Sequence, residues 1–266
     1  MSMDIDFNEW KARKPMGISG CFRVRNEAQF MEQAIRSHLP FLDEAVLCVQ
    51  PSDDDTLAIA RRLAAEDERV KVFEYELVPD WIDTPGFYEN DPDKPGHLVH
   101  MSNWALSKCS YSWICKVEGD VIALSTVQNI VERVFERPMD THYYGRVILN
   151  VAGEKCDQIS LDNPRNGGWD EAFFNNDPDR FRFVRSGRWE SVPMGSAATC
   201  MGWSALHMKR CKAGKIGWNG ERYGAYTRQG VRDGLEAFNR RNPYPGRDDP
   251  LGAECLFEAT LVTEAQ

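Results

Sequence analysis

Two carboxylates separated by one glycine, Glu118-Gly119-Asp120, stand at the end of an apolar run of strand length, residues 111–117. Such a run is typical of a buried strand, which would deliver both acids to one edge of a sheet. Two carboxylates at this spacing can hold a divalent cation, and a hard cation held this way completes its shell with phosphate oxygens. The tripeptide therefore predicts a site for a metal and a diphosphate. The alternative is an acidic turn without a ligand.

Composition narrows the class of protein. The chain has 266 residues, of which 42% are hydrophobic and 27% charged, as is typical of a globular protein with a substantial core. A net charge of -9 argues against non-specific binding to nucleic acid, because that binding depends on Lys and Arg neutralising phosphates. A phosphate-bearing ligand remains compatible with this charge if a metal or local basic groups offset it.

Cysteine usage and the N-terminus indicate a reducing compartment. The eight cysteines form no Cys-x-x-Cys pair and several lie inside apolar runs, so we expect reduced core thiols rather than zinc ligands or disulfides. Residues 1–7 lack the basic segment and apolar core of a secretory signal. No apolar run reaches the ~18 residues needed to span a bilayer. These features predict a cytoplasmic protein.

The first half of the chain alternates between predicted strands and predicted helices. Apolar runs of strand length predict strands, and apolar residues at helical spacing predict helices. Strands are expected at 16–22, 45–49, 70–75, 111–117 and 142–149, and helices near 30–38, 57–64, 98–109 and 127–135. This order predicts an α/β fold with a parallel sheet, whose ligands lie at the carboxyl ends of the strands.

Other stretches are less regular. Residues 77–96 hold four prolines and predict a long surface loop of the kind that covers a site, and we expect His97 and His100 after it to be surface groups. Beyond residue 150 the patterns predict a strand at 181–185, a turn at 186–187, a strand passing into a helix within 197–208 and a helix near 231–240. With no clear linker, residues 1–266 are expected to form a single domain.

Four segments, residues 18–27, 49–56, 101–106 and 113–120, follow one another in the order of known motifs. The first carries Arg25-Asn26-Glu27 and the last carries Glu118-Gly119-Asp120 in the place of a metal-binding Asp-x-Asp motif. On these motifs the chain resembles a glycosyltransferase of the GT-A fold, closest to the family 2 type. Farther on, residues 179–189 are similar to an Arg-Phe-Arg strand of that group, and residues 167–171 to a Gly-Gly-Phe-Asp-Glu stretch.

The resemblance implies a fold, an activity and its partners. The fold would be GT-A (Rossmann-like), a mostly parallel sheet flanked by helices, with a nucleotide-sugar-binding half at 16–150 and an irregular acceptor-binding half at 151–266. The activity would be transfer of a sugar from a nucleotide-sugar donor to a glycan or lipid-linked acceptor with Mn²⁺ or Mg²⁺. The family as a whole suggests a role in surface polysaccharide or glycoconjugate synthesis.

The resemblance also assigns roles to residues. Asp120 would be a direct metal ligand, and Glu118 would contact the ribose, or the metal through water. His207 would be a third ligand, with a buried core histidine as the alternative. An inverting transfer needs a carboxylate base, for which Asp170 and Glu171 are the candidates, whereas a retaining transfer needs none. Residues expected to contact the nucleotide donor are Arg23, Arg25, Glu27, Asp54, Asn103 and Glu118.

Departures from the family pattern leave alternatives open. Val49 or Gln50 replaces the acid that contacts the nucleoside, and Ser102 stands where an Arg is usual, so the nucleotide is not identified. One alternative is a sugar nucleotidyltransferase, against which the lack of a Gly-rich basic loop after the first strand counts. The other is a catalytically silent GT-A-like module that binds a glycan. Peripheral membrane contact through a basic patch also stays open; the patch comprises Arg180, Arg182, Arg185 and Arg188.

Overall fold

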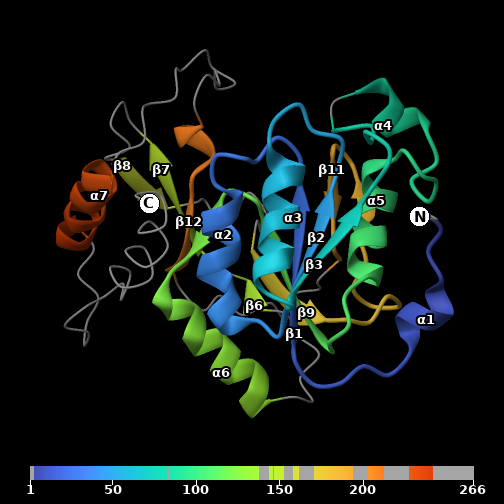
Figure 1. Ribbon diagram of the computed structural model, residues 1–266, viewed down its shortest axis with the longest axis horizontal. Coiled ribbons are helices and arrows are strands. Elements are labelled where there is room, and N and C mark those ends of the chain that lie inside the picture. Colours follow the sequence, from blue (N-terminus) through green and yellow to red (C-terminus); the bar gives the residue numbers. More distant parts are fainter. Residues whose placement is uncertain are drawn as a thin grey trace.

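The computed structural model describes residues 3–82, 84–137, 144–145, 147–152, 158–161, 171–193, 203–212 and 228–241. The main element is a six-stranded sheet with the strand order β3-β2-β1-β4-β9-β6 (Figure 1). Its strands are β3 (Val70–Glu74), β2 (Glu44–Val49), β1 (Ile18–Val24), β4 (Trp113–Glu118), β9 (Ala172–Asn175) and β6 (Tyr144–Gly145). The first four are parallel, and β9 runs antiparallel to both β4 and β6. The fold is therefore α/β with a mostly parallel central sheet, as the sequence predicted.

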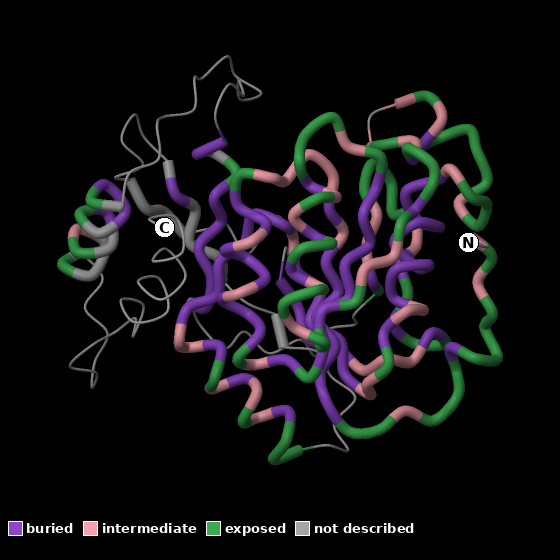
Figure 2. The backbone as a smooth tube through the Cα atoms, in the orientation of Figure 1, coloured by how far each residue is buried: buried purple, intermediate pink, exposed green. Residues whose placement is uncertain are grey.

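Helices cover both faces of this sheet. One face packs against α2 (Met31–His38), α3 (Thr56–Glu66) and α6 (Gln128–Glu136), and the other against α5 (Leu98–Ser107), which is almost entirely buried. Figure 2 shows the buried strands between these layers. Because alternate side chains of a strand point to opposite faces, Arg23 of β1 and Glu118 of β4 both face the α5 layer.

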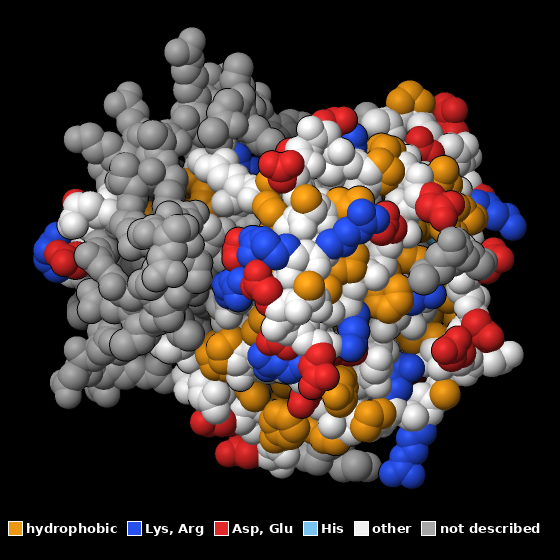
Figure 3. Space-filling view, in the orientation of Figure 1, with side chains coloured by type: hydrophobic (Ala, Val, Ile, Leu, Met, Phe, Trp, Pro, Cys, Tyr) orange, Lys and Arg blue, Asp and Glu red, His pale blue; other side chains and the backbone are white. Residues whose placement is uncertain are grey.

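The outer surface of α2 and α3 is a solvated face of mixed charge. Arg62 of α3 bridges Glu32 of α2 at 2.5 Å and Glu66 of its own helix at 3.0 Å, and Arg36 pairs with the same two acids. Figure 3 shows acidic and basic side chains interspersed over this part of the molecule. Such half-exposed pairs contribute little to stability, typically about 0–1 kcal/mol each. The interspersed charges make this face an ordinary solvent surface.

A second sheet begins where the first one ends. Its four strands are ordered β5-β12-β7-β8, with β5 (Val121–Ala123), β12 (Trp203–His207), β7 (Val147–Ala152) and β8 (Gln158–Leu161). Strand β12 is antiparallel to β5 and parallel to β7. Only Gly119 and Asp120 separate β4 of the large sheet from β5 of the small one. The acidic motif thus occupies the junction of the two sheets.

A hairpin from the second half of the chain lies over α5. It comprises β10 (Val184–Ser186) and β11 (Trp189–Ser191), and Gly187 takes a positive φ of 59° at its turn. The Asn103 side chain of α5 holds the start of the hairpin, since its Nδ2 donates to the Phe183 carbonyl (2.9 Å) and its Oδ1 accepts from the Phe183 N–H (2.8 Å). The helix therefore fixes the hairpin through both backbone groups of one residue.

Three further helices complete the described chain. They are the short helices α1 (Phe7–Lys11) and α4 (Pro85–Glu89) and the longer α7 (Arg228–Arg241), together with 3-10 turns at Leu39–Phe41, Ser125–Val127 and Lys209–Cys211. Helix α4 lies within the long loop expected at 77–96, and the Arg185 guanidinium ties it to the hairpin by donating to the carbonyls of Phe87 and Tyr88. No helix in the described ranges is long and apolar enough to cross a membrane.

The elements predicted up to residue 135 are confirmed within two residues at each end, and the strand expected at 142–149 is divided between β6 and β7. Five cysteines (21, 48, 109, 115 and 211) are buried free thiols, as expected, and the other three lie outside the described residues. The expectation that His97 and His100 lie at the surface is wrong. His97 is 1% exposed and accepts from the Val99 N–H as the N-cap of α5, and the His100 ring contacts the Tyr75 hydroxyl at 3.1 Å.

In the second half, boundaries differ more from the predictions. The strand expected at 181–185 begins only at Val184, because both backbone groups of Phe183 bond to the Asn103 side chain and not to a neighbouring strand. The strand within 197–208 is β12, but a single 3-10 turn follows it in place of the expected helix. The helix expected near 231–240 is confirmed as α7.

Candidate metal centre

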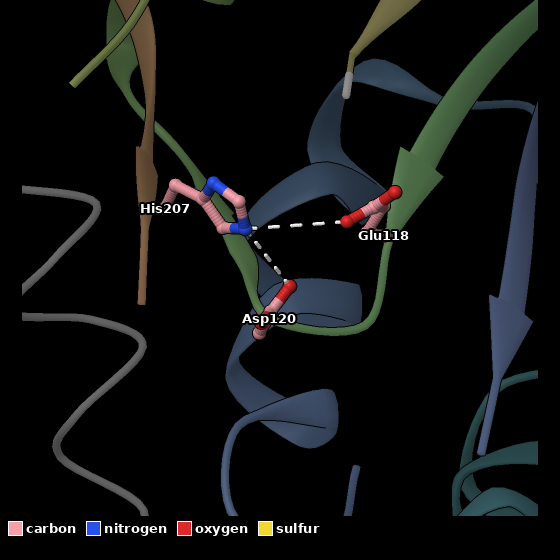
Figure 4. A group of neighbouring side chains, drawn as sticks. All are labelled: Glu118, Asp120 and His207. Carbon is pink, nitrogen blue, oxygen red and sulfur yellow. Dashed lines mark ion pairs between the residues drawn. The ribbon is translucent and has the colours of Figure 1, made fainter. Parts of the chain in front are cut away.

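Three potential ligands converge at the junction of the two sheets. Glu118 ends β4, Asp120 lies in the turn before β5, and His207 ends β12. The Nε2 atom of His207 lies 3.6 Å from Asp120 Oδ1 and 4.0 Å from Glu118 Oε2. Figure 4 shows the three side chains pointing toward one another. The structure thus brings together the three residues that the sequence predicted as metal ligands.

Strand pairing explains how His207 reaches the acidic turn. In the antiparallel register of β12 and β5, His207 is the partner of Val121, next to Asp120. The Met208 N–H extends this ladder by donating to the Asp120 carbonyl at 2.8 Å. Since both strands are buried, a slip of one residue would turn His207 to the opposite face of the sheet. The position of the imidazole is therefore fixed by the register of the small sheet.

The carboxylates of the centre are kept ionised by their neighbours. Burial alone would raise the pKa of Asp120, but His207 and Lys212 hold that pKa well below its ordinary value. Burial also opposes ionisation of Glu118, yet Lys116 and His207 lower its pKa despite the nearby charge of Asp120. An ionised carboxylate is the form that binds a cation.

Lys212 is a fourth member of the centre that sequence reasoning missed. Its ammonium group lies 2.6 Å from Asp120 Oδ2 and 2.6 Å from Glu27 Oε1, and the residue is 7% exposed. Burial alone would lower the pKa of Lys212. The charges of Asp120 and Glu27 outweigh burial, so the pKa of Lys212 is raised. No local pattern marks this lysine, because its partner Glu27 lies 185 residues away.

The three ligand atoms lie close to the spacing that one divalent cation requires. Carboxylate oxygen suits Mg²⁺ and Mn²⁺, and imidazole nitrogen also coordinates first-row metals. Two ligands that each lie about 2.1 Å from an ion are separated by up to about 4.2 Å. The two separations from His207 Nε2, 3.6 and 4.0 Å, fall within that limit, and all three ligand atoms lie within 4.8 Å of one another. Asp120 Oδ1 is buried and faces this point, while its other oxygen is bound by Lys212.

The loop after β1 lies beside the centre and is held by polar contacts. Thr56 Oγ1 accepts from the Glu27 N–H at 2.8 Å, and Asp54 accepts from the Ala28 N–H at 3.1 Å. Burial would raise the pKa of Asp54, but hydrogen bonds from Thr56 and Ala28 lower it. Arg25 donates to the Pro51 carbonyl at 3.3 Å from the same loop. Asp54 thus braces this loop against α3, and its predicted contact with a nucleoside remains a prediction.

Arg23 forms an ion pair with the β10–β11 hairpin. Its guanidinium pairs with Glu190 of β11 and donates to Ser102 of α5 at 2.5 Å, and the side chains of Arg23 and Glu190 are only 10% and 14% exposed. Burial would lower the pKa of Arg23, but Glu190 raises it. Arg23 is the register partner of Glu118, so the pair adjoins the metal centre. Glu190 was not among the predicted residues.

The other described residues predicted to bind the donor or to act as the base are not among the groups that converge at the metal centre. Asn103 uses its amide to hold the backbone of Phe183. Glu171 has no exposed surface and lies 3.4 Å from Ser204 Oγ and 3.9 Å from His38 Nε2 inside the core. In this position it is closed to an acceptor hydroxyl, so the structure gives no support to Glu171 as the base. Asp170 lies outside the described residues.

Gly119 offers a direct test of how tightly the acidic turn is packed. A Cβ atom on Gly119 would lie 2.9 Å from both Glu27 Cγ and Val24 Cγ1. Because Glu27 is held by Lys212, it cannot move away at no cost. We expect Gly119→Ala to lower the free energy of unfolding by about 1–3 kcal/mol, measured by urea denaturation. An unchanged midpoint would show that the turn has more room than the structure indicates.

No protein-family model matches the chain, and no curated protein matches it either. Among solved structures, S. aureus TarS is similar over 52% of this chain but only 22% of its own length, at 19% identity and a TM-score of 0.33. A structure of TarS residues 1–349 is similar over 88% of this chain and 76% of that one, at 13% identity and a TM-score of 0.45.

A third similar structure is glucosyl-3-phosphoglycerate synthase from Mycobacterium tuberculosis, in complex with Mn²⁺, uridine diphosphate and glucosyl-3-phosphoglycerate. The similarity covers 89% of this chain and 82% of that one, at 14% identity and a TM-score of 0.47. Because these identities lie between 13% and 19%, the roles proposed for the metal centre rest on the residues of this chain alone.

Proposed function

We propose that this chain is a metal-dependent glycosyltransferase of the GT-A type, which moves a sugar from a nucleotide-sugar donor to a glycan or lipid-linked acceptor. The observation that carries the proposal is the convergence of Glu118, Asp120 and His207 beside the loop after β1. This point lies at the carboxyl ends of parallel strands, where open α/β sheets bind their ligands. A cation there would bind the donor diphosphate.

The protein residues have separate tasks in this reaction. A Mn²⁺ or Mg²⁺ ion bound by Asp120, His207 and Glu118 would act as a Lewis acid on the departing diphosphate. Asp120 supplies Oδ1 and is held in orientation through Oδ2 by Lys212. The β12–β5 register sets the direction of the His207 ring, and β4 delivers Glu118.

Donor binding is assigned to the loop after β1 and its neighbours. Arg25 is partly exposed there, and we assign its guanidinium to the donor phosphates or nucleoside. Glu27, Asp54 and Asn103 would act indirectly by fixing the loop and the hairpin. Arg23 would contact the donor while it remains paired with Glu190. Asp170 remains the proposed base if the transfer inverts configuration.

The acceptor and the location are also proposals. A role in surface polysaccharide or glycoconjugate synthesis, in the cytoplasm, accords with the resemblance of residues 18–120 to family 2 enzymes. The hairpin strand β11 leaves Trp189 55% exposed, next to Glu190. An exposed aromatic ring of this kind can stack on a sugar, which supports a glycan acceptor.

The proposal is tested by calorimetric titration of UDP, GDP, dTDP and CMP with and without Mn²⁺, followed by donor hydrolysis with the matching sugar nucleotides. We expect one nucleotide to bind only when Mn²⁺ is present, and its sugar derivative to be hydrolysed slowly without acceptor. Release of pyrophosphate from a nucleoside triphosphate and a sugar phosphate would instead indicate a nucleotidyltransferase. Binding of glycans without any nucleotide would indicate a binding module.

A further inference from the structure

The charges around the metal centre nearly balance before any cation binds. Three carboxylates meet there, those of Glu27, Glu118 and Asp120. Two ammonium groups lie against them, since Lys212 bridges Glu27 and Asp120 at 2.6 Å and Lys116 lies 3.7 Å from Glu118. With a neutral imidazole, these five groups sum to one negative charge, which the charge of Lys209 near Glu118 reduces further. The centre therefore supplies at most half of the negative charge that a divalent cation needs for neutrality.

Lys212 binds the same carboxylate that would hold the cation. One oxygen of Asp120 faces His207 and Glu118, and the other is bound by Lys212. The two oxygens of a carboxylate belong to one group, so the ammonium and the cation would share the same acid. Both would be positive and only a few ångströms apart in a buried region, where like charges repel more strongly than in water.

We propose that Lys212 is a built-in counter-ion that weakens binding of a free divalent cation, so that the cation is retained only together with a diphosphate. This inference rests on the proposed function, because it takes Asp120, His207 and Glu118 as the cation ligands. In the free protein the lysine lies 2.6 Å from both Glu27 and Asp120 and offsets part of their negative charge. A diphosphate brings the missing negative charge, so donor and cation bind cooperatively.

A role in charge balance and a role in positioning predict opposite results. If Lys212 served only to orient Asp120, its removal would loosen a ligand and weaken cation binding, by the 10–100-fold typical of outer-shell partners. If its charge opposes the cation, removal of that charge will tighten binding. The sign of the change in affinity therefore separates the two roles.

The experiment is calorimetric titration of MnCl2 into the full chain without nucleotide, for wild type and three variants. We expect Lys212→Met to bind Mn²⁺ about tenfold more tightly than wild type, and to lose most of the gain in Mn²⁺ affinity that UDP or GDP gives to wild type. Glu27→Gln removes a negative charge and should bind Mn²⁺ about tenfold more weakly. Lys71→Met, an exposed lysine of β3, is the matched control and should not change the affinity.

Equal or weaker Mn²⁺ binding by Lys212→Met than by wild type would overturn the inference. If that variant does not fold, Glu27→Gln decides, since unchanged or tighter binding would contradict the charge argument. A different result would show that the proposed function itself is wrong. In that case neither wild type nor any variant binds Mn²⁺, with or without a nucleoside diphosphate.

Discussion

Asp120→Asn will abolish Mn²⁺-dependent binding of the nucleoside diphosphate and lower sugar transfer by more than about 100-fold. Outer-shell partners of metal ligands typically account for 10–100-fold, and Asp120 is proposed as a direct ligand. The amide keeps the shape of the side chain but loses the charge that a hard cation requires. Calorimetry with Mn²⁺ and nucleotide measures the first effect, and initial rates with the sugar donor measure the second.

The same variant should unfold differently in acid. The folded protein lowers the pKa of Asp120, so its ionised form stabilises the fold above the ordinary value of 3.8. This contribution is lost as the pH falls from that value toward the lowered pKa. An amide side chain at this position cannot titrate, so stability of the variant should decline less steeply below about pH 4.

Asp55→Asn is the matched control for these measurements. Asp55 is an exposed acid at the start of α3, and its side chain makes no capping hydrogen bond. Its replacement should leave cation binding and transfer unchanged. If Asp120→Asn behaved like this control, the acidic turn would be a structural feature and the proposed metal centre would be wrong.

The sequence predicted the central sheet because its inner strands are buried on both sides. Runs in which apolar residues dominate, such as 45–49 and 113–117, favour inner strands, and helices between them indicate parallel pairing. The carboxyl ends of parallel strands share one edge. For this reason Glu118 and the loop at Glu27 could be placed near each other from the sequence alone.

Contacts between distant segments could not be predicted in this way. Periodicity reports local structure, whereas Lys212 meets Glu27 across 185 residues and Glu190 meets Arg23 across 167. His207 was predicted from a resemblance, with a core histidine as the alternative. What brings it to Asp120 is the register between β12 and β5, which sequence spacing does not reveal.

Ser102 shows how a departure from a motif can be absorbed. The chain has this serine where the glycosyltransferases that its motifs resemble usually have an arginine. In the structure the Ser102 hydroxyl lies against the guanidinium of Arg23, which comes from β1, and against Glu190 at 2.6 Å. A small side chain on α5 leaves room for that guanidinium. The positive charge of this layer thus comes from β1 instead of from α5.

Arg23→Met should cost about 3–5 kcal/mol of the free energy of unfolding, because it removes the ion-pair partner of Glu190 in a mostly buried position and leaves that acid only the Ser102 hydroxyl. The side chains of Arg23 and Glu190 are only 10% and 14% exposed. Glu190→Gln should cost less, since Arg23 also lies near the charge of Glu118. Urea denaturation of wild type, both single variants and the double variant yields the coupling energy.

The exposed pair Arg61–Glu74 is the control for this cycle. Its atoms are 2.6 Å apart, but its side chains are 62% and 49% exposed, so its coupling energy should be about 0.2–1 kcal/mol. A coupling of about 2–3 kcal/mol for Arg23 and Glu190 would show that the hairpin is anchored by charge at the edge of the metal centre. A value as small as that of the control would mean that Asn103 and the apolar contacts of Phe183 hold the hairpin instead.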